Sequence, residues 1–287
     1  RALRGVHRTV ERLQARLAAR DELDDTLILL VSDHGAAPIH THLDLADWFR
    51  AQGVRTLSHP VIWTRDPLAA VMVAGNCSAT VYARPNERRS GRYRMEELRA
   101  PGMFGAGRDL VASLTDEPAV AFVAAEAGDG AVTVVSRNGE ARIGRAGGEM
   151  TYQPLRGDPL ELGGTVSGDG RHWLDATWDS AYPDAVSQLL DQFSASRTGD
   201  LIVIAGEGYD FRERYEVPEH RSGHGSLVRS HMQTPLWSSA PLPGGPLRTV
   251  DVFPAMLSWL GVPLPPSVAS PPAWLPERGG ARSVGVA

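Results

Sequence analysis

The spacing of apolar residues at the start of the chain predicts a helix followed by a strand. Apolar residues recur at positions 6, 10, 13 and 17 among Arg, Glu and Gln, which is the pattern of an amphipathic helix that ends near Arg20. Five apolar residues at 27–31 then indicate a strand buried on both faces, as in a parallel sheet. That strand stops at Ser-Asp-His-Gly, residues 32–35. Since ligands bind beyond the carboxyl ends of strands in open α/β sheets, Asp33 and His34 are placed at a candidate site.

The middle of the chain has the pattern of antiparallel strands. Strands are predicted at 70–74 and 79–83 around Gly75-Asn76, and a short helix is predicted at 110–114. Further strands at 120–124, 132–136 and 141–143 are separated by Gly-Asp-Gly and Asn-Gly, which are hairpin signals. We expect this stretch to leave the main sheet as an antiparallel excursion and to end in a long loop over 144–175.

Alternating helix and strand patterns return after residue 180. A helix is predicted from Pro183, a second buried strand at 200–205, and a last helix from Asp251 that ends before Gly261. A Pro-rich tail occupies 264–287. The predicted fold class is therefore α/β, with a mixed, largely parallel sheet between helices and an antiparallel insertion at about 84–175.

Composition narrows the function classes. The 287 residues are 42% hydrophobic and 22% charged with a net charge of −5, as in a soluble globular protein, and they lack the basic bias of nucleic-acid-binding modules. No apolar run reaches the ~18 residues of a membrane-spanning helix. All 29 basic residues are arginine, which indicates a GC-rich bacterial genome. A single cysteine, Cys77, excludes an internal disulfide and is predicted to be a small buried hydrophobe.

The candidate chemistry lies in two glycine-flanked loops. Asp33 and His34 follow the first buried strand, and His224 lies between two glycines beyond the second. Aspartate and histidine are zinc ligands, and parallel strands would bring the two loops to one edge of the sheet. A solvated strand-ending turn at Asp33 and a loop histidine bonded to the backbone at 224 would give the same residues.

Several motifs in combination resemble the alkaline phosphatase superfamily. These are Ser-Asp-His-Gly after a buried strand, Gly-His-Gly-Ser-Leu at 223–227 before Thr234-Pro235, and Arg-Thr-Val-Asp-Val-Phe-Pro at 248–254. The chain is most similar to type I phosphodiesterase/nucleotide pyrophosphatase-like proteins. The resemblance implies hydrolysis of phosphodiester or nucleotide-type pyrophosphate bonds with two divalent ions, usually zinc. It assigns Asp33 and His34 to one ion and His224 to the other.

Part of the family pattern is not found. The family also uses an early Asp ligand, an Asp-x-x-x-His pair and a Thr or Ser nucleophile, none of which is recognisable before Asp33. We therefore expect residues 1–287 to be the C-terminal portion of one phosphodiesterase-like domain. The nucleophile would lie upstream of Arg1, and the chain alone would be inactive. Phosphonate or sulfate-ester hydrolysis, phosphomutase chemistry, or a non-catalytic domain with vestigial metal ligands remain as alternatives.

The other histidines carry weaker expectations. His40 and His42 could line a substrate entrance, although a solvated loop is the expected place for them. His220 and His231 are expected in surface loops on either side of His224. The expected partner is a small phosphoester substrate, without nucleic acid or membrane, and the sequence determines neither the localisation nor the oligomeric state.

Overall fold

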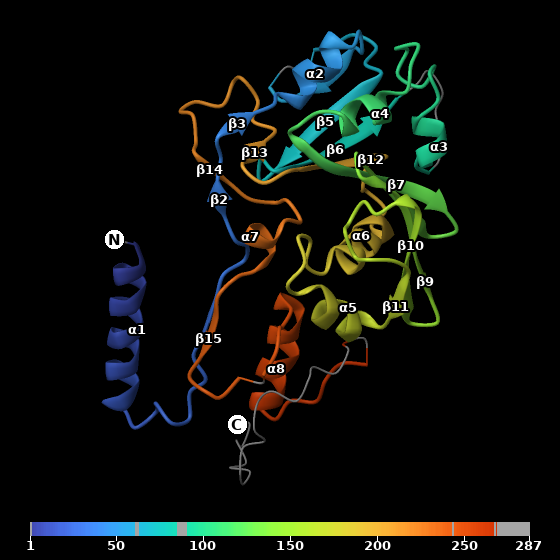
Figure 1. The fold of residues 1–287 in the computed structure, drawn as a ribbon. Coiled ribbons are helices and arrows are strands. Elements are labelled where there is room, and N and C mark those ends of the chain that lie inside the picture. The colour runs from blue at the N-terminus through green and yellow to red at the C-terminus, as the bar shows by residue number, and fades with distance from the viewer. Residues whose placement is uncertain (1, 61–62, 85–90, 243, 267, 269–287) are drawn as a thin grey trace. The chain divides into compact units, whose positions relative to one another are not determined.

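Residues 34–234 form one of two units of the chain and are built around a nine-stranded sheet. The computed structural model describes residues 2–60, 63–84, 91–242, 244–266 and 268. The strand order is β11-β10-β9-β8-β7-β12-β6-β5-β4 (Figure 1). The strands are β4 (Thr56–Ser58), β5 (Ala69–Ala74), β6 (Ser78–Ala83), β7 (Val120–Gly128), β8 (Ala131–Ser136), β9 (Gly139–Ala146), β10 (Glu149–Gly157), β11 (Val166–Gly168) and β12 (Leu201–Ala205).

The sheet is mixed, as predicted, but it is not largely parallel. In the described part of the chain, β4 and β5 are the parallel pair of this sheet, and the remaining neighbours run antiparallel. Turns of two or three residues join β5 to β6, β7 to β8, β8 to β9 and β9 to β10. A parallel pair needs a crossover of a dozen residues or more, so these short turns dictate antiparallel pairing.

The prediction of a long loop over 144–175 was wrong, because this range contains β10, β11 and the helix α5 (Gly170–Thr177). Met150 and Tyr152 alternate with more exposed neighbours along β10, and they are buried in the core. The strand is irregular near Pro154, which obscured its pattern. The strands β7 to β11 belong to the same sheet as β12 and β6, whereas the sequence had predicted that this stretch leaves the main sheet. The boundaries of an insertion at about 84–175 stay a prediction.

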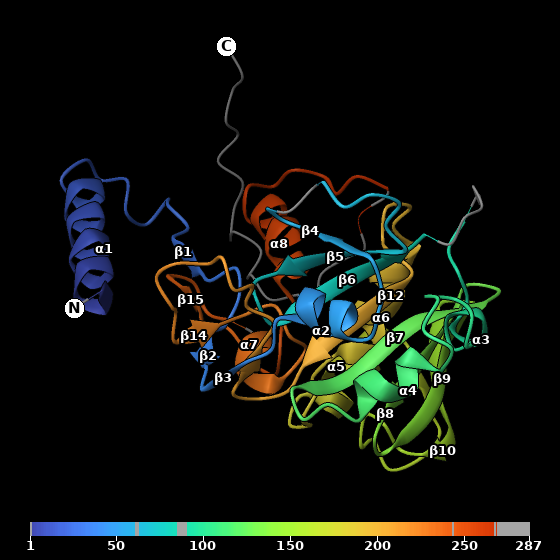
Figure 2. The same cartoon turned by 90° about the horizontal axis from the view of Figure 1, so that it is seen from above.

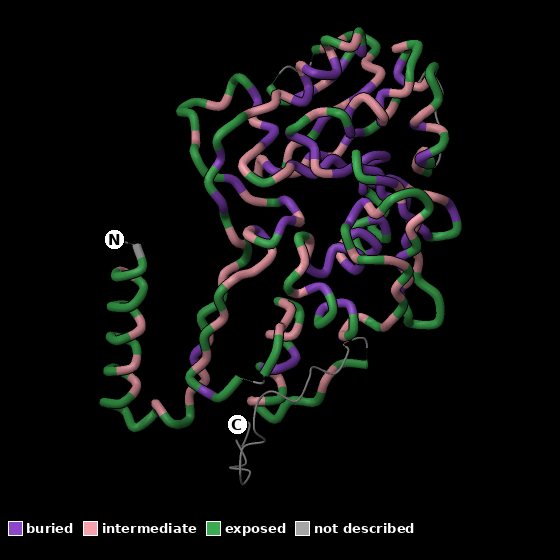
Figure 3. Tube along the Cα trace, in the orientation of Figure 1, coloured by how far each residue is buried: buried purple, intermediate pink, exposed green. Residues whose placement is uncertain are grey.

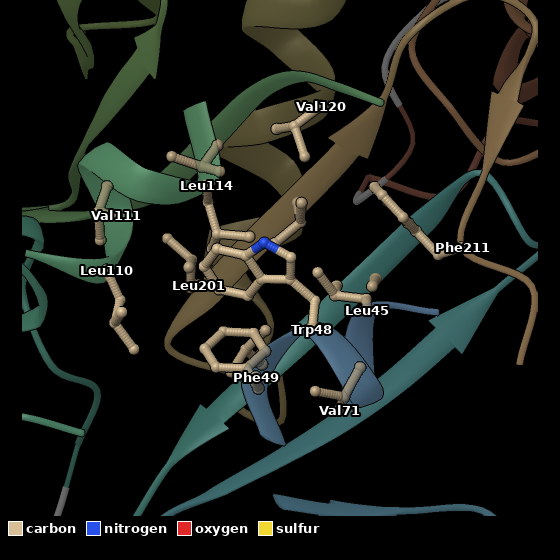
Figure 4. Close-up of a cluster of buried hydrophobic side chains, with 14 of the residues drawn as sticks. Leu45, Trp48, Phe49, Val71, Leu110, Val111, Leu114, Val120, Leu201 and Phe211 are labelled. Atoms are coloured by element: carbon tan, nitrogen blue, oxygen red, sulfur yellow. The ribbon is translucent and has the colours of Figure 1, made fainter. Parts of the chain in front are cut away.

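Helices cover both faces of the sheet (Figures 1 and 2). Side chains of β12 alternate between two hydrophobic clusters: Leu201 and Val203 belong to one, Ile202 and Ile204 to the other. Figure 4 shows the first cluster, with Phe49 and other side chains of the nearby helices against the sheet. Helices α2 (Leu45–Ala51), α3 (Met95–Leu98) and α4 (Leu110–Thr115) pack on the first cluster's face, and α5 and α6 (Ala185–Ser194) on the other. The helices expected at 110–114 and from 183 are thus confirmed within a few residues.

Burial follows this layering in residues 34–234. Figure 3 shows buried segments along the strands and the helices packed on them. Trp173 on α5 is the largest fully buried side chain, and its indole Nε1–H donates to the Met150 carbonyl at 3.0 Å. Both the volume and the polar atom of this side chain are therefore accommodated in the core.

The other unit comprises residues 1–33 and 235–287. Its elements are α1 (Ala2–Ala18), β1 (Leu29–Val31), β15 (Leu236–Ser238), the 3-10 turn η1 (Thr249–Asp251) and α8 (Val252–Trp259). The two predicted helices are confirmed, and no described helix combines the length and hydropathy needed to cross a membrane. Most of the tail predicted at 264–287 lies outside the described residues.

The first strand differs from the prediction of a central parallel strand. Strand β1 pairs antiparallel with β15, Leu29 opposite Ser238, in a two-stranded ladder. Leu30 and Val31 are 43% and 38% exposed, so the strand is not buried on both faces. An apolar run predicts an extended segment, but its burial depends on the partners that the fold supplies. Among the described residues, that partner is one short strand.

Candidate metal centre

Short paired segments gather two loops at the carboxyl end of β12. Antiparallel pairing places Ile204 opposite Ser78, so the turn between β5 and β6 lies beside the end of β12. The Ala205 N–H donates to the Cys77 carbonyl at 3.0 Å, and the Ser226 hydroxyl donates to the Ala205 carbonyl at 2.8 Å. The segments are β2 (Ala37–Pro38), β3 (Thr41–His42), β13 (Tyr209–Asp210), β14 (Ser222–Gly223) and α7 (Arg229–Met232).

His224 is held against the β5–β6 turn by its own backbone. Its N–H donates to the Gly75 carbonyl at 2.9 Å, and its carbonyl accepts from the Cys77 N–H at 3.0 Å. Gly75 has a φ of +56°, and a Cβ at this position would come within 2.6 Å of the His224 Nδ1. The absence of a side chain at Gly75 therefore leaves room for the His224 imidazole.

Cys77, in the same turn, is fully buried, as predicted. Burial together with nearby Asp210 raises the pKa of its thiol to about 12, so the thiol stays neutral.

His34 stacks on His224. The two ring centroids are 3.6 Å apart and the ring planes differ by 6°. The His34 Nδ1 is 2.9 Å from the Gly35 carbonyl, which can only accept, so Nδ1 carries the proton and Nε2 the lone pair. In this tautomer, the lone pair on Nε2 can bind a metal ion. The structure thus brings together two of the three residues singled out from the sequence.

Asp33, the third, ends the other unit of the chain and is joined to His34 by one peptide bond. Its part in a metal centre stays a prediction from the sequence motif. His40 is exposed, as a solvated loop residue would be.

The prediction of a surface loop for His231 was wrong. This side chain is 4% exposed, and its Nδ1 accepts from the Ser226 N–H at 3.2 Å. The proton is therefore on Nε2, which is buried and has no hydrogen-bond partner among the described residues. Burial lowers the pKa of His231, and His224 and His34 lower it further against the opposing charge of Glu207. His231 is thus a neutral, buried hydrogen-bond donor near the stacked pair, and no signal in its sequence context marked it.

A second cluster lies in the same unit. His42, expected in a solvated loop, and His220, expected at the surface, both contact the buried carboxylate of Asp210. His42 Nδ1 is 2.7 Å from one carboxylate oxygen and His220 Nε2 is 2.6 Å from the other. His42 and Asp210 are register partners in the parallel pair β3–β13, a contact that spans 168 residues of sequence. Only tertiary pairing could reveal it, and Asp210 was not a candidate.

A comparison with family models identifies the scaffold. The model for type I phosphodiesterase / nucleotide pyrophosphatase matches residues 1–227. The chain belongs to this family. Enzymes of the family cleave phosphodiester and nucleotide pyrophosphate bonds and depend on metal ions, and the family lies within the alkaline phosphatase superfamily. No curated protein and no solved structure matches the chain. The matched range includes both histidine clusters, whereas His231 lies just beyond it.

On the sequence-based prediction that His224 binds zinc, we expect Gly75→Ala to weaken zinc binding about tenfold, an effect of the size seen when a residue that orients a metal ligand is lost. The new methyl group would displace the His224 imidazole, since it would lie 2.6 Å from Nδ1. Gly147→Ala is the matched control, because Gly147 also lies in a hairpin turn with φ of +59° but has nothing within 4 Å. Competition with a chromogenic chelator measures the affinity. Equal losses in the two variants would attribute the effect to backbone strain instead.

Proposed function

We propose that this chain provides the metal-binding and phosphate-binding part of a zinc-dependent phosphodiesterase or nucleotide pyrophosphatase. The observation that carries the proposal is the stacked pair of His34 and His224. In a two-metal phosphoryl-transfer site the ions lie ~3.5–4 Å apart. Parallel imidazoles 3.6 Å apart have the spacing required for each ring to serve its own ion. The donor set therefore fits the metals on which the family depends.

We assign His34 to one ion and His224 to the other, with Asp33 as the carboxylate that accompanies His34. When bound, such ions neutralise phosphoryl oxygens and stabilise the charge that develops on the leaving oxygen. The chain's own residues orient the ligands. The Gly35 carbonyl selects the His34 tautomer, and the Gly75 turn holds His224 through two backbone hydrogen bonds.

His231 adds a donor to this arrangement. Its Nε2–H is buried without a partner among the described residues, which costs roughly 1–3 kcal/mol unless a ligand accepts the hydrogen bond. A phosphoryl oxygen is an acceptor of the right kind. The lowered pKa keeps His231 neutral. This N–H could therefore donate to a phosphoryl oxygen without adding a positive charge that would repel a nearby metal ion. We propose that His231 orients the phosphate.

The test is binding of adenosine monophosphate to the zinc-loaded chain, measured by titration calorimetry. Binding is the readout because no residue in the described part of the chain is assigned as the nucleophile. We expect adenosine monophosphate to bind with zinc present, and adenosine, which lacks the phosphate, to bind at least ~100-fold more weakly, as expected when charge-assisted contacts to an anion are lost. His34→Ala and His224→Ala should abolish the difference, whereas His7→Ala, on the exposed surface of α1, should preserve it.

Adenosine monophosphate binding that needs neither zinc nor the stacked histidines would refute the proposal. In that case the family scaffold would serve here without metal-assisted phosphate binding.

A further inference from the structure

The cluster around Asp210 has a chemistry that the proposed function does not use. The Asp210 side chain has no accessible surface, and removing a carboxylate from water costs several kcal/mol unless it is paired. Its two oxygens face one imidazole nitrogen each, from His42 and His220. The ligand atoms of the three residues all lie within 4.8 Å of one another. Ligand atoms around one tetrahedral zinc ion are ~3.4 Å apart, so small side-chain movements would suffice to close such a site.

The outer nitrogen of each imidazole faces a second carboxylate. His42 Nε2 is 3.2 Å from Glu219, and His220 Nδ1 is 3.6 Å from Glu216. Metal-bound histidines commonly present their second ring nitrogen to a carboxylate, which fixes the tautomer and raises the basicity of the metal-facing nitrogen. Here both imidazoles have this arrangement, with their inner nitrogens directed at Asp210.

The contact between His220 and Asp210 brings two metal-binding groups together. The His220 Nε2 lies 2.6 Å from a carboxylate oxygen of Asp210. The Asn76 amide nitrogen is 2.8 Å from Nε2 and 3.4 Å from Nδ1 of the same ring, so it lies over the imidazole and does not occupy the in-plane lone pair of Nε2. A cation bound by that lone pair and by the Asp210 carboxylate would turn their close approach into shared ligation.

We propose that His42, Asp210 and His220 form a binding site for a divalent cation of the zinc class, distinct from the ions assigned to Asp33, His34 and His224. Two imidazoles and one carboxylate suit zinc and similar first-row ions. The ion would be structural, because it ties together three segments: β3, β13 and the loop that returns at His220. The residue after β13 is also held by the backbone, since the Phe211 N–H donates to the Asn76 carbonyl of the β5–β6 turn at 2.6 Å. Such an ion stabilises the folded state because it binds the folded chain and not the unfolded chain.

The site can be tested in the His34→Ala/His224→Ala variant, which removes the stacked pair. We expect this variant to bind about one cobalt ion per chain and to show the visible absorption of four-coordinate cobalt. Adding Asp210→Asn or His220→Ala should abolish both signals. His40→Ala is the local control, because this exposed histidine lies two residues from His42 and outside the cluster.

A complementary measurement does not depend on the folding of the double variant. In the otherwise unmodified chain, His220→Ala should lower the bound zinc by about one equivalent and abolish part of the rise in melting temperature on zinc addition. No cobalt bound by the His34→Ala/His224→Ala variant, together with unchanged zinc content in His220→Ala, would overturn the proposal. Equal loss of the ion in His40→Ala would also count against it, since the loss would not be specific to the three ligands. Either result would leave the cluster as a hydrogen-bonded network.

Discussion

We expect His224→Ala to lower the affinity for zinc at the stacked pair by at least ~100-fold. Loss of an outer residue that merely orients a metal ligand costs 10–100-fold, so the loss of a ligand should cost at least as much. His224 is also the ring on which His34 stacks, with centroids 3.6 Å apart. Its removal would therefore take away one ligand and the surface that positions the other.

The measurement is competition with a zinc chelator in an Asp210→Asn background, where the second cluster makes no contribution. His7→Ala is the control, because that histidine is 73% exposed in its side chain and is paired with Glu11 on the surface of α1. The control should leave the affinity within a factor of two or three, as is usual for exposed substitutions. A His224→Ala variant with unaltered affinity would show that zinc does not bind at the stacked pair.

A second large effect is expected on stability. Trp173→Ala should reduce the free energy of unfolding of the unit formed by residues 34–234 by ~3–5 kcal/mol, the usual cost of truncating a buried tryptophan. The side chain is fully buried in the cluster that includes Val186 and Phe193. The hydrogen bond from its Nε1–H to the Met150 carbonyl would be lost as well.

Urea unfolding followed by far-UV circular dichroism measures this loss. Trp63→Ala is a matched control for the change of residue type, since Trp63 is 83% exposed and should cost less than ~0.5 kcal/mol. Comparable destabilisation by the two substitutions would mean that Trp173 does not carry the packing described here. A change in the dependence on urea, rather than in the midpoint, would instead indicate an altered denatured state.

Local sequence patterns determined most of the secondary structure. Hairpins β5–β6, β7–β8 and β8–β9 were predicted because Gly and Asn mark positions of left-handed backbone, and the structure has positive φ at Gly75, Asn76 and Gly130. The amphipathic helices were also predicted from local pattern, because apolar residues that recur with a period of about 3.6 residues can be recognised in the sequence alone. The pattern does not identify what covers an apolar stripe, and Leu3 and Leu13 on α1 are exposed.

The direction and the partners of the strands were decided by tertiary structure. The apolar run at 27–31 has the composition of a buried parallel strand, yet β1 pairs antiparallel with β15 alone among the described residues. Strand pairing depends on which backbone groups are brought within hydrogen-bonding distance, and residues far apart in sequence supply them. Similarly, the irregularity near Pro154 concealed β10, which only its pairing with β9 and β11 defines as a strand.

Of the two histidine clusters, one was predictable from the sequence and the other was not. His34 and His224 were found from sequence because glycine-flanked polar residues after apolar runs form a contiguous motif. The cluster of His42, Asp210 and His220 was not, because its members come from β3, β13 and a later loop and have no common local pattern. Sequence by itself determined the family, the turns of three hairpins and the helices α1, α4, α6 and α8 of this protein. Its tertiary structure alone decided which imidazole faces which carboxylate, because such contacts arise from the long-range pairing of segments that local propensity does not specify.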